Sequence, residues 1–337
     1  MSKRLRGAGW GRLLQQSLKL MAGPAARAGR AGVGRAVKAH AQALRPPPGP
    51  GDWLPGVVMS AAGARRYRVY RPPGLAAGQG VPLVVMLHGC GQDAKTFAVS
   101  TRMNRVAARE GFIVLYPEQD RLANLQGCWN WFDTDSGRAQ GEAELIMKAI
   151  AQVARLFPVD RARTALVGLS AGASMAALIA TRHPDSFRAV VMHSGVPPGR
   201  AHSPMTAVGA MHGRRPRGAA AVLLPSAASA TAARPPLLVI HGANDTVVSP
   251  RNGHAAALDW AAATGAVAGP ARGLQRGRRH PMTVTDFHLG KRLVAQWVGV
   301  SHLGHAWSGG AAGKAHSDVR GPDASRLAWA FIRRQWP

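Results

Sequence analysis

Short apolar runs alternate with helical patterns through most of this chain, and that alternation limits the folds open to it. The apolar runs lie at residues 81–87, 112–116, 164–167, 189–192, 237–240 and 293–300. Helical patterns lie at residues 103–110, 142–157, 173–181 and 324–334. A strand that is apolar on both faces is buried on both faces, as in parallel sheets. We therefore predict an α/β fold of three layers, with helices on both faces of a mostly parallel sheet.

The segment Gly168-Leu169-Ser170-Ala171-Gly172 stands between a predicted strand and a predicted helix. This context is typical of a nucleophile elbow, a sharp turn that exposes a serine hydroxyl at the edge of the sheet. Small flanking residues prevent collisions at such a turn. A glycine-rich structural turn is the alternative, but the position between strand and helix favours Ser170 as a nucleophile.

A serine hydroxyl needs a base, usually a histidine that a carboxylate orients, and on this fold the acid precedes the histidine in the chain. Asp245 is the best candidate acid because it follows the buried strand at 237–240, where functional groups gather in α/β sheets. The alternative for Asp245 is a turn or helix-capping role. Three other acids are less suitably placed, namely Asp185, Asp259 and Asp286.

Among thirteen histidines, His305 stands out because it follows the last predicted strand and Gly304 permits a sharp turn beside it. His302 is its competitor, three residues earlier. Three further histidines lie at strand ends and are predicted to be structural or to line a pocket: His88, His193 and His241.

An acyl-transfer reaction also needs backbone donors for the developing oxyanion. The N–H of Ala171, directly after the nucleophile, is one expected donor. The second is expected from the loop after the third strand, where the Cys90 N–H is the candidate. Loss of one such donor typically costs about 100- to 1,000-fold in rate. The reaction requires no metal and no cofactor.

The first 50 residues carry ten basic side chains and no acidic one, within a chain whose net charge is +27. Residues 10–21 have the pattern of a short basic amphipathic helix, and a Pro- and Gly-rich linker follows at 46–51. We therefore predict a flexible basic extension at 1–51 and a catalytic domain at 52–337. Binding of the extension to a membrane or granule surface is the alternative. Polar residues interrupt the apolar run that a secretory signal needs, and no apolar run is long enough for a transmembrane helix.

Two stretches, 205–234 and 261–280, are rich in Ala, Gly, Arg and Pro. Their apolar patterns are weak, as in surface loops. We predict that both are surface insertions.

Four motifs together resemble one known family. They are Leu87-His88-Gly89-Cys90-Gly91-Gln92, Cys128-Trp129-Asn130-Trp131-Phe132, Gly168-Leu169-Ser170-Ala171-Gly172 and Leu303-Gly304-His305-Ala306-Trp307-Ser308-Gly309-Gly310. In this order, over residues 53–335, they resemble the esterase family of polyhydroxybutyrate (PHB) depolymerases, to which feruloyl and acetylxylan esterases are related. The resemblance implies an α/β-hydrolase fold and a Ser170–His305–Asp245 triad.

The resemblance also implies a disulfide between Cys90 and Cys128. It would close a loop of 39 residues, for which the chain-entropy model gives about 4 kcal/mol of stabilisation. Two reduced thiols are the alternative, and a cytosolic location would favour them. By resemblance we expect an extracellular or periplasmic protein, with a cytoplasmic or granule-associated one as the alternative.

The triad predicts a serine esterase, a carboxylic ester hydrolase that acts through an acyl-enzyme, and the family resemblance implies PHB or its oligomers as the substrate. A feruloyl or acetylxylan esterase and, less well, a serine peptidase fit the same machinery. A third hypothesis is a protein that binds an anionic surface or granule through residues 1–50 and has secondary hydrolase activity. No nucleic-acid motif is present, so no specific nucleic-acid partner is predicted. Candidates for pocket walls, or equally for ordinary core, are Trp129, Trp131 and Trp307, with His88 beside them.

Overall fold

A computed structural model of the chain describes residues 46–75, 78–214 and 234–336. The chain divides into two units, Met1–Pro46 and Pro47–Pro337, and the description below concerns the second. The helix predicted at 10–21, the basic segment at 1–45 and most of the stretch at 205–234 lie outside the described residues. In the part that is described, no helix is long and apolar enough to cross a membrane.

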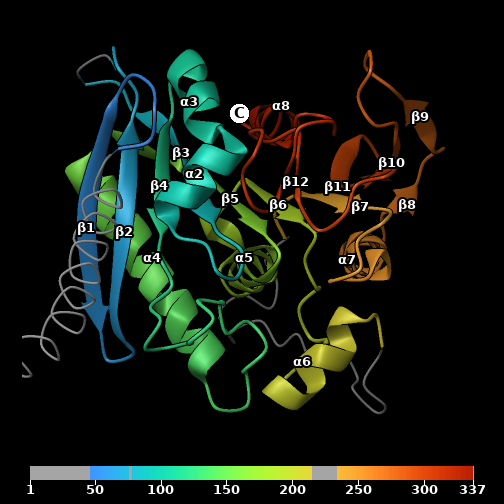
Figure 1. Cartoon of the computed structure of the whole chain (residues 1–337), viewed down its shortest axis with the longest axis horizontal. Helices are drawn as coiled ribbons and strands as arrows, with labels where there is room; N and C mark the ends of the chain where they lie inside the picture. The colour runs from blue at the N-terminus through green and yellow to red at the C-terminus, as the bar shows by residue number, and fades with distance from the viewer. Residues whose placement is uncertain (1–45, 76–77, 215–233, 337) are drawn as a thin grey trace, which may run out of the picture. The chain divides into compact units, whose positions relative to one another are not determined.

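The described residues form an eleven-stranded sheet whose strands run in the order β1-β2-β4-β3-β5-β6-β7-β11-β10-β8, with β9 also paired to β10 (Figure 1). The six strands from β4 to β11 in this order are parallel to their neighbours. Antiparallel pairs extend the sheet at both edges. The strands are β1 (Asp52–Ser60), β2 (Gly63–Arg71), β3 (Val81–Leu87), β4 (Ile113–Pro117), β5 (Val159–Leu169), β6 (Ala189–His193), β7 (Leu237–Gly242), β8 (Val267–Ala268), β9 (Arg272–Leu274), β10 (Met282–Leu289) and β11 (Arg292–Val300).

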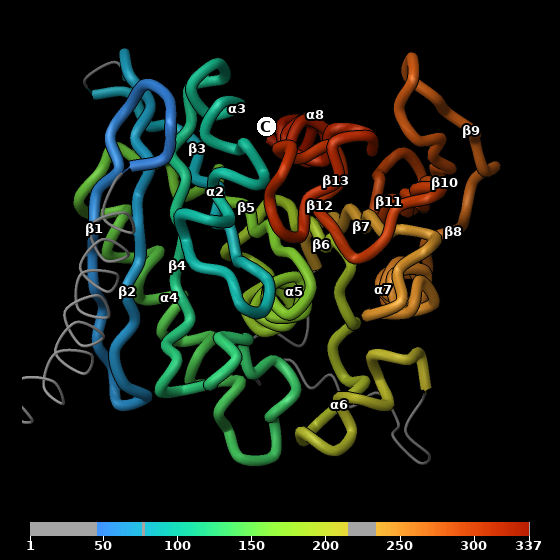
Figure 2. Tube along the Cα trace, viewed as in Figure 1, coloured from blue at the N-terminus to red at the C-terminus, as the bar shows by residue number. Residues whose placement is uncertain are grey.

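Helices cover both faces of the sheet. Helices α2, α3 and α8 pack on one face and α4, α5 and α7 on the other, as Figures 1 and 2 show. Two short strands, β12 (Trp307–Ser308) and β13 (Ser317–Asp318), form a separate parallel pair. The helices are α2 (Ala94–Thr101), α3 (Met103–Glu110), α4 (Arg138–Leu156), α5 (Ala171–Arg182), α6 (Pro204–Met211), α7 (Pro250–Ala262) and α8 (Ala324–Arg333), with a 3-10 turn at Pro184–Ser186.

Strand β3 shows why the central strands are apolar without interruption. Leu83, Val85 and Leu87 enter the core on the α4–α5–α7 side, whereas Val84 and Met86 enter the core on the opposite side. All five side chains are fully buried. The predicted three-layer α/β architecture is therefore confirmed, because a strand covered on both faces has no position for a polar side chain.

The edges of the sheet differ from the expectation. The stretch 261–280 was predicted to be a surface insertion, but it contains β8 and β9, which pair with β10. The start of the stretch 205–234 is likewise helical, because Ser203 caps α6 and Thr206 completes the capping box. Strands β8 and β9 are exposed along their length. They therefore carry no apolar pattern from which they could be recognised.

Candidate active site

Ser170 occupies the sharp turn between β5 and α5. Its backbone is at φ 55° and ψ −122°, a conformation that side chains rarely adopt. A Cβ atom on Gly168 would lie 2.2 Å from the Gly172 carbonyl oxygen, and one on Gly172 would lie 2.2 Å from the Leu87 carbonyl oxygen. The Ser170 N–H donates to the His193 carbonyl at 2.8 Å. Both glycines are thus needed for the turn, which β6 holds in place.

His305 lies in the loop after β11 and contacts both Ser170 and Asp245. Its Nε2 is 2.9 Å from Ser170 Oγ, and its Nδ1 is 2.8 Å from Asp245 Oδ2. The Asp245 side chain is fully buried and that of His305 is 10% exposed. The three candidates from the sequence therefore form one continuous hydrogen-bonded chain.

The competing residues lie elsewhere. The ring of His302 faces His280, with 5.7 Å between their centroids. Asp259 pairs with an arginine, and Asp286 pairs with another while accepting a hydrogen bond from Gln296 at 2.6 Å. Asp185 lies in the 3-10 turn after α5. None of these side chains has a contact with Ser170 among the described residues.

The carboxylate of Asp245 is held on both oxygens. Oδ1 accepts the N–H groups of Val247 and Val248 at 3.0 and 2.9 Å, while Oδ2 faces His305 and His241. Burial raises the pKa of Asp245, but the hydrogen bonds from His241 and His305 and the backbone N–H of Val248 outweigh it. The pKa therefore lies well below the ordinary range, and the carboxylate stays ionised.

His241, at the end of β7, is a second imidazole on the same carboxylate. Its Nε2 lies 3.2 Å from Asp245 Oδ2 and 2.9 Å from the Val248 carbonyl oxygen, so one N–H serves two acceptors. The ring is fully buried, and its Nδ1 has no partner among the described residues. A Cβ atom on Gly253 would lie 2.5 Å from that Nδ1. His241, predicted to be structural or pocket-lining, thus contacts the candidate acid directly.

His193, at the end of β6, supports the segment that follows His305. Its Nε2 accepts the Ser308 N–H at 3.1 Å, and its ring stacks on Trp307. The Nδ1–H then faces Ser194 Oγ at 3.2 Å. Burial, with the nearby His241 and His305, lowers the pKa of His193 to about 3. A neutral His193 therefore anchors the His305 loop to the sheet. In the part of the chain that the structure describes, no group of three or more His, Cys, Asp or Glu side chains is arranged to hold a metal ion.

The loop after β3 leaves one backbone donor free beside the elbow. The Gly89 N–H donates to Gln92 Oε1, and the N–H groups of Gly91 and Gln92 donate to backbone carbonyls. The Cys90 N–H has no acceptor among the described residues. The Ala171 N–H belongs to the first turn of α5, where helical N–H groups have no partner within the helix. The Cys90 N–H is thus unoccupied among the described residues, and the Ala171 N–H has no acceptor within its own helix.

Cys90 and Cys128 form a disulfide, as the family resemblance implied. Their sulfur atoms are 2.08 Å apart, and the described residues include no free cysteine. The bond joins the loop after β3 to the segment after β4. The Gly91 N–H adds a second link by donating to the Gln126 carbonyl at 2.9 Å. The segment that bears the Cys90 N–H is therefore tied at two adjacent points.

The expected pocket walls are mostly core. His88, Trp129 and Trp307 have no exposed surface, and Trp131 is 8% exposed. His88 donates from Nδ1 to the Gly89 carbonyl and accepts the Gln119 N–H at Nε2. The Trp129 indole donates to the His88 carbonyl, and the Trp307 indole donates to Ser325 Oγ. The rings of His88, Trp129 and Trp307 therefore hold neighbouring segments together and cannot touch a substrate in this structure.

A buried carboxylate that the sequence did not single out supports the same region. Glu142 on α4 accepts hydrogen bonds from Arg65 at 3.1 Å, from Gln119 at 2.6 Å and from both the backbone and the side chain of Asn130. Asn130 follows the disulfide-bonded Cys128 by two residues. Glu142 therefore holds the segment after the disulfide. A single glutamate in a helical pattern resembles a solvated one, so the sequence carries no signal for this role.

The chain matches a family model and several curated proteins. The family model described as Esterase PHB depolymerase matches residues 65–276. Poly(3-hydroxyalkanoate) depolymerase C of Paucimonas lemoignei is 31% identical over 185 residues, which cover 54% of this chain and 44% of that protein. Acetylxylan esterase A of Talaromyces purpureogenus is 26% identical over 224 residues, which cover 62% and 56%. The chain thus spans about half the length of these relatives.

Solved structures share the fold. An acetyl xylan esterase from Aspergillus awamori aligns with a TM-score of 0.65 at 19% identity, covering 83% of this chain and 99% of that one. A ferulic acid esterase aligns with a TM-score of 0.54 at 16% identity, covering 86% and 99%. These TM-scores show that the chains share an α/β fold. Since the family model spans well over half of the sequence, this chain belongs to the esterase family of PHB depolymerases.

Proposed function

We propose that this protein is a serine esterase that hydrolyses carboxylic esters with Ser170 as nucleophile, His305 as base and Asp245 as the orienting acid. The observation that carries the proposal is the unbroken chain from Asp245 Oδ2 through both ring nitrogens of His305 to Ser170 Oγ. The strained backbone of Ser170 supports it, because such strain is typical of a nucleophile elbow. Membership of an esterase family supports the same reaction class.

The proposed reaction starts as Ser170 Oγ attacks the ester carbonyl carbon while His305 Nε2 takes the hydroxyl proton. The Cys90 and Ala171 N–H groups donate to the oxyanion of the tetrahedral intermediate. The protonated His305 then gives its proton to the leaving alcohol, and an acyl-enzyme on Ser170 remains. Water, activated by the same imidazole, attacks the acyl carbon and frees Ser170. The ionised Asp245 holds the Nδ1–H of His305 and stabilises the imidazolium.

The proposed substrate is a polyester of short hydroxyacids, namely PHB or its oligomers. The relative that is named as a poly(3-hydroxyalkanoate) depolymerase supports this choice of substrate.

Large apolar side chains are also exposed on segments that a disulfide, a hydrogen bond or the chain itself connects to the candidate active site. Leu122 and Leu125, 94% and 86% exposed, lie just before the disulfide, and Val247 lies two residues after Asp245. Helix α6 exposes Met205 and Val208 and is tied to the Asp245 loop through the Met211 carbonyl and the Ser249 N–H. Exposed apolar groups of this kind suit contact with a water-insoluble polymer.

A small acyl or feruloyl ester is the second candidate substrate. It is favoured by relatives named as acetylxylan esterases and by the fold shared with acetyl xylan and ferulic acid esterases. The catalytic groups would act in the same way, because the triad does not determine the pocket.

The proposed organisation is a catalytic domain at 52–337 that follows a basic extension at 1–51. The proposed working compartment is an oxidising one, outside the cell or in a periplasm. The Cys90–Cys128 disulfide supports this location, because such bonds persist mainly in oxidising compartments.

The test of the function is release of 3-hydroxybutyrate from amorphous PHB by the full chain, with p-nitrophenyl acetate as a small ester in parallel. Ser170→Ala is expected to lower both rates by about 10⁴- to 10⁶-fold, as removal of a serine nucleophile does elsewhere. Ser136→Ala, at an exposed serine of the loop before α4, is the control and is expected to keep full activity. Undiminished hydrolysis by Ser170→Ala would contradict the mechanism. Activity on p-nitrophenyl acetate without activity on PHB would contradict only the proposed polyester substrate.

A further inference from the structure

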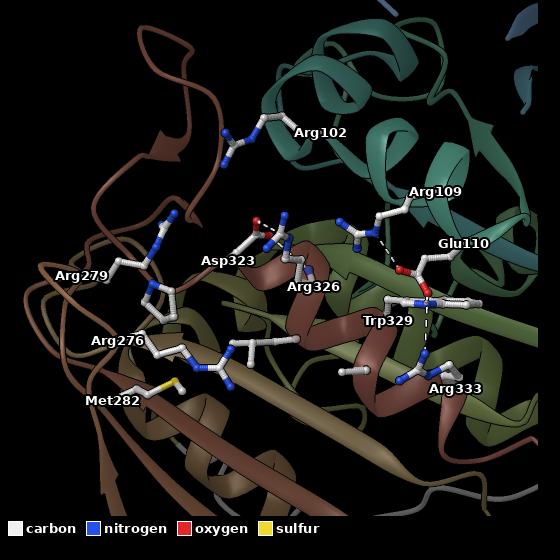
Figure 3. Close-up of a pocket in the computed structure, with 13 residues that line it drawn as sticks. Arg102, Arg109, Glu110, Arg276, Arg279, Met282, Asp323, Arg326, Trp329 and Arg333 are labelled. Atoms are coloured by element: carbon white, nitrogen blue, oxygen red, sulfur yellow. Dashed lines mark hydrogen bonds and ion pairs between the residues drawn. The ribbon is translucent and has the colours of Figure 1, made fainter. Parts of the chain in front are cut away.

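A cavity of about 470 Å³ lies between α3, α8 and the segment that joins β9 to β10 (Figure 3). None of the three triad residues lines it. Its lining includes two carboxylates, Glu110 and Asp323, and six cations. The cations are six arginines: Arg102, Arg109, Arg276, Arg279, Arg326 and Arg333.

The two carboxylates are engaged with only half of these arginines. Glu110 accepts a hydrogen bond from Arg109 at 2.8 Å and lies 3.7 Å from Arg333. It also accepts the indole N–H of Trp329 at 2.9 Å. Asp323 caps α8 and lies 3.7 Å from Arg326. The charge of the other three arginines has no carboxylate partner among the described residues.

Two of those three guanidinium groups are already held in place by backbone carbonyls. Arg102 donates to the Gly309 carbonyl, and Arg279 donates to the carbonyls of Gly321 and Val319 at 2.6 and 3.3 Å. A guanidinium has five N–H donors, so these contacts leave several donors of each group unused. The Arg276 side chain has no partner among the described residues. Figure 3 shows Arg276 and Arg279 together on the β9–β10 segment and Arg102 apart from them, beside α3.

We propose that this cavity binds a small anion with two or more clustered phosphate groups. Cations that carry no counter-charge and converge from separate elements attract a multivalent anion more strongly than a monovalent one. A guanidinium matches phosphate oxygens with paired hydrogen bonds. Tetrahedral phosphates accept in several directions, which suits donors on the loop before α3 and on the β9–β10 segment, whereas a planar carboxylate offers fewer directions. The volume is in the range of small-molecule sites.

The bounded shape favours a small ligand over a nucleic acid. Phosphate-driven binding of a nucleic acid uses an extended basic surface, and single strands also need exposed aromatic rings for stacking. The aromatic residue of this cavity, Trp329, is only 6% exposed and stacks on Phe112 with 4.1 Å between ring centroids. Its ring serves as a rigid wall and is not available to a base.

The test is calorimetric titration of the full chain with sodium tripolyphosphate at constant ionic strength. One saturable site is expected. The double variant Arg276→Gln/Arg279→Gln is expected to weaken binding by roughly tenfold or more, since each lost contact to a charged group is worth about a factor of ten. The single variant Arg276→Gln, at a side chain without folded partners, is expected to weaken binding in the same direction without affecting the fold.

The matched control is Arg121→Gln/Arg292→Gln, which removes the same charge at two exposed arginines outside the cavity. It is expected to leave the dissociation constant within about twofold, because distant surface charges are screened by salt. Equal weakening by both double variants, or no saturable site, would overturn the proposal.

A second titration uses ATP, which carries three linked phosphates on a nucleoside, whereas tripolyphosphate carries them alone. Comparing the two dissociation constants shows whether the ligand is a nucleotide or a free polyphosphate. Tighter binding of ATP than of tripolyphosphate, lost in Arg276→Gln/Arg279→Gln, supports a nucleotide. Binding of a duplex DNA oligomer that survives this variant, with no tripolyphosphate binding, would overturn the proposal. Ester hydrolysis is measured on each variant, so that failure of this site is distinguished from failure of the proposed function.

Discussion

Asp245 and His241 are joined by a contact of 3.2 Å between the carboxylate Oδ2 and the imidazole Nε2, and this oxygen is the one that His305 Nδ1 contacts at 2.8 Å. The other oxygen, Oδ1, is occupied by two backbone N–H groups. The candidate acid is therefore fixed by four donors, of which only one belongs to the triad. A buried carboxylate needs such partners to remain charged.

His241→Leu is expected to lower kcat by about 10- to 100-fold, because it removes a charge-assisted hydrogen bond from the carboxylate that orients His305. The acid limb of the kcat/KM profile is expected to move to higher pH, since Oδ2 then interacts with His305 alone. His241→Gln, which keeps a donor, is expected to restore part of the rate. The measurement is a pH–rate profile on p-nitrophenyl acetate. A lower rate with an unmoved acid limb would mean that His241 only supports the fold.

Stability is expected to fall in mild acid because of His193. Burial lowers the pKa of His193 to about 3, whereas an unfolded histidine titrates near 6.5. Below about pH 6.5 the unfolded chain therefore binds a proton that the folded chain does not bind, and the loss continues until pH approaches the folded pKa. At pH 5 this difference costs about 2 kcal/mol.

His193→Gln separates this contribution from that of other groups. The free energy of unfolding, measured by urea denaturation at pH 7.5 and pH 5, is expected to fall less in His193→Gln than in the wild type, by about 2 kcal/mol. The variant is expected to start from a lower value at pH 7.5, since the stacking of the imidazole on Trp307 is lost. Equal losses between the two pH values would show that His193 is not the responsible group.

The elements that the sequence predicts correctly have a regular pattern of buried apolar residues. Strand β3 and helix α3 end at the predicted residues, because one is apolar on both faces and the other has a clear apolar stripe. Strands β8 and β9 were missed because exposed strands at the edge of a sheet are not required to be apolar. Strand β10, which buries Met282, Val284 and Phe287, was missed as well. Helix α4 starts at Arg138, four residues before its predicted start, and no side chain caps it. Without a capping residue the sequence holds no start signal.

The site divides in the same way. Ser170 and the Gly168–Gly172 turn are local features, so strand, turn and helix can be recognised from neighbouring residues. Asp245 and His305 were selected by chain order and strand ends, and they lie within hydrogen-bond distance of each other. Burial of Trp129 and Trp307 depends on segments far away in the chain. An aromatic residue in a motif therefore does not show whether it faces the core or a ligand.

Loss of the disulfide is expected to impair both stability and catalysis. Cys90→Ser/Cys128→Ser opens a 39-residue loop, for which the chain-entropy model gives about 4 kcal/mol. The Cys90 N–H is the proposed oxyanion donor, so a looser loop is expected to lower kcat by about 10- to 100-fold, below the cost of a deleted donor. Thermal unfolding and kcat are measured with and without dithiothreitol. As the control, the double variant is expected to show the same unfolding temperature and kcat with and without the reductant. An unchanged kcat in the double variant would mean that the disulfide does not position the oxyanion donor.

Glu142→Gln is expected to lower the free energy of unfolding by about 3–5 kcal/mol, because it leaves the Arg65 guanidinium buried without its counter-charge. Both side chains are more than nine-tenths buried. The loss of an acceptor is also expected to loosen Asn130 beside the disulfide, and KM and kcat are to be measured with urea denaturation. Glu144→Gln, at a half-exposed position on the same helix, is the matched control and is expected to change stability by less than about 0.5 kcal/mol. Similar small effects for both variants would mean that the buried pair contributes little beyond a surface glutamate.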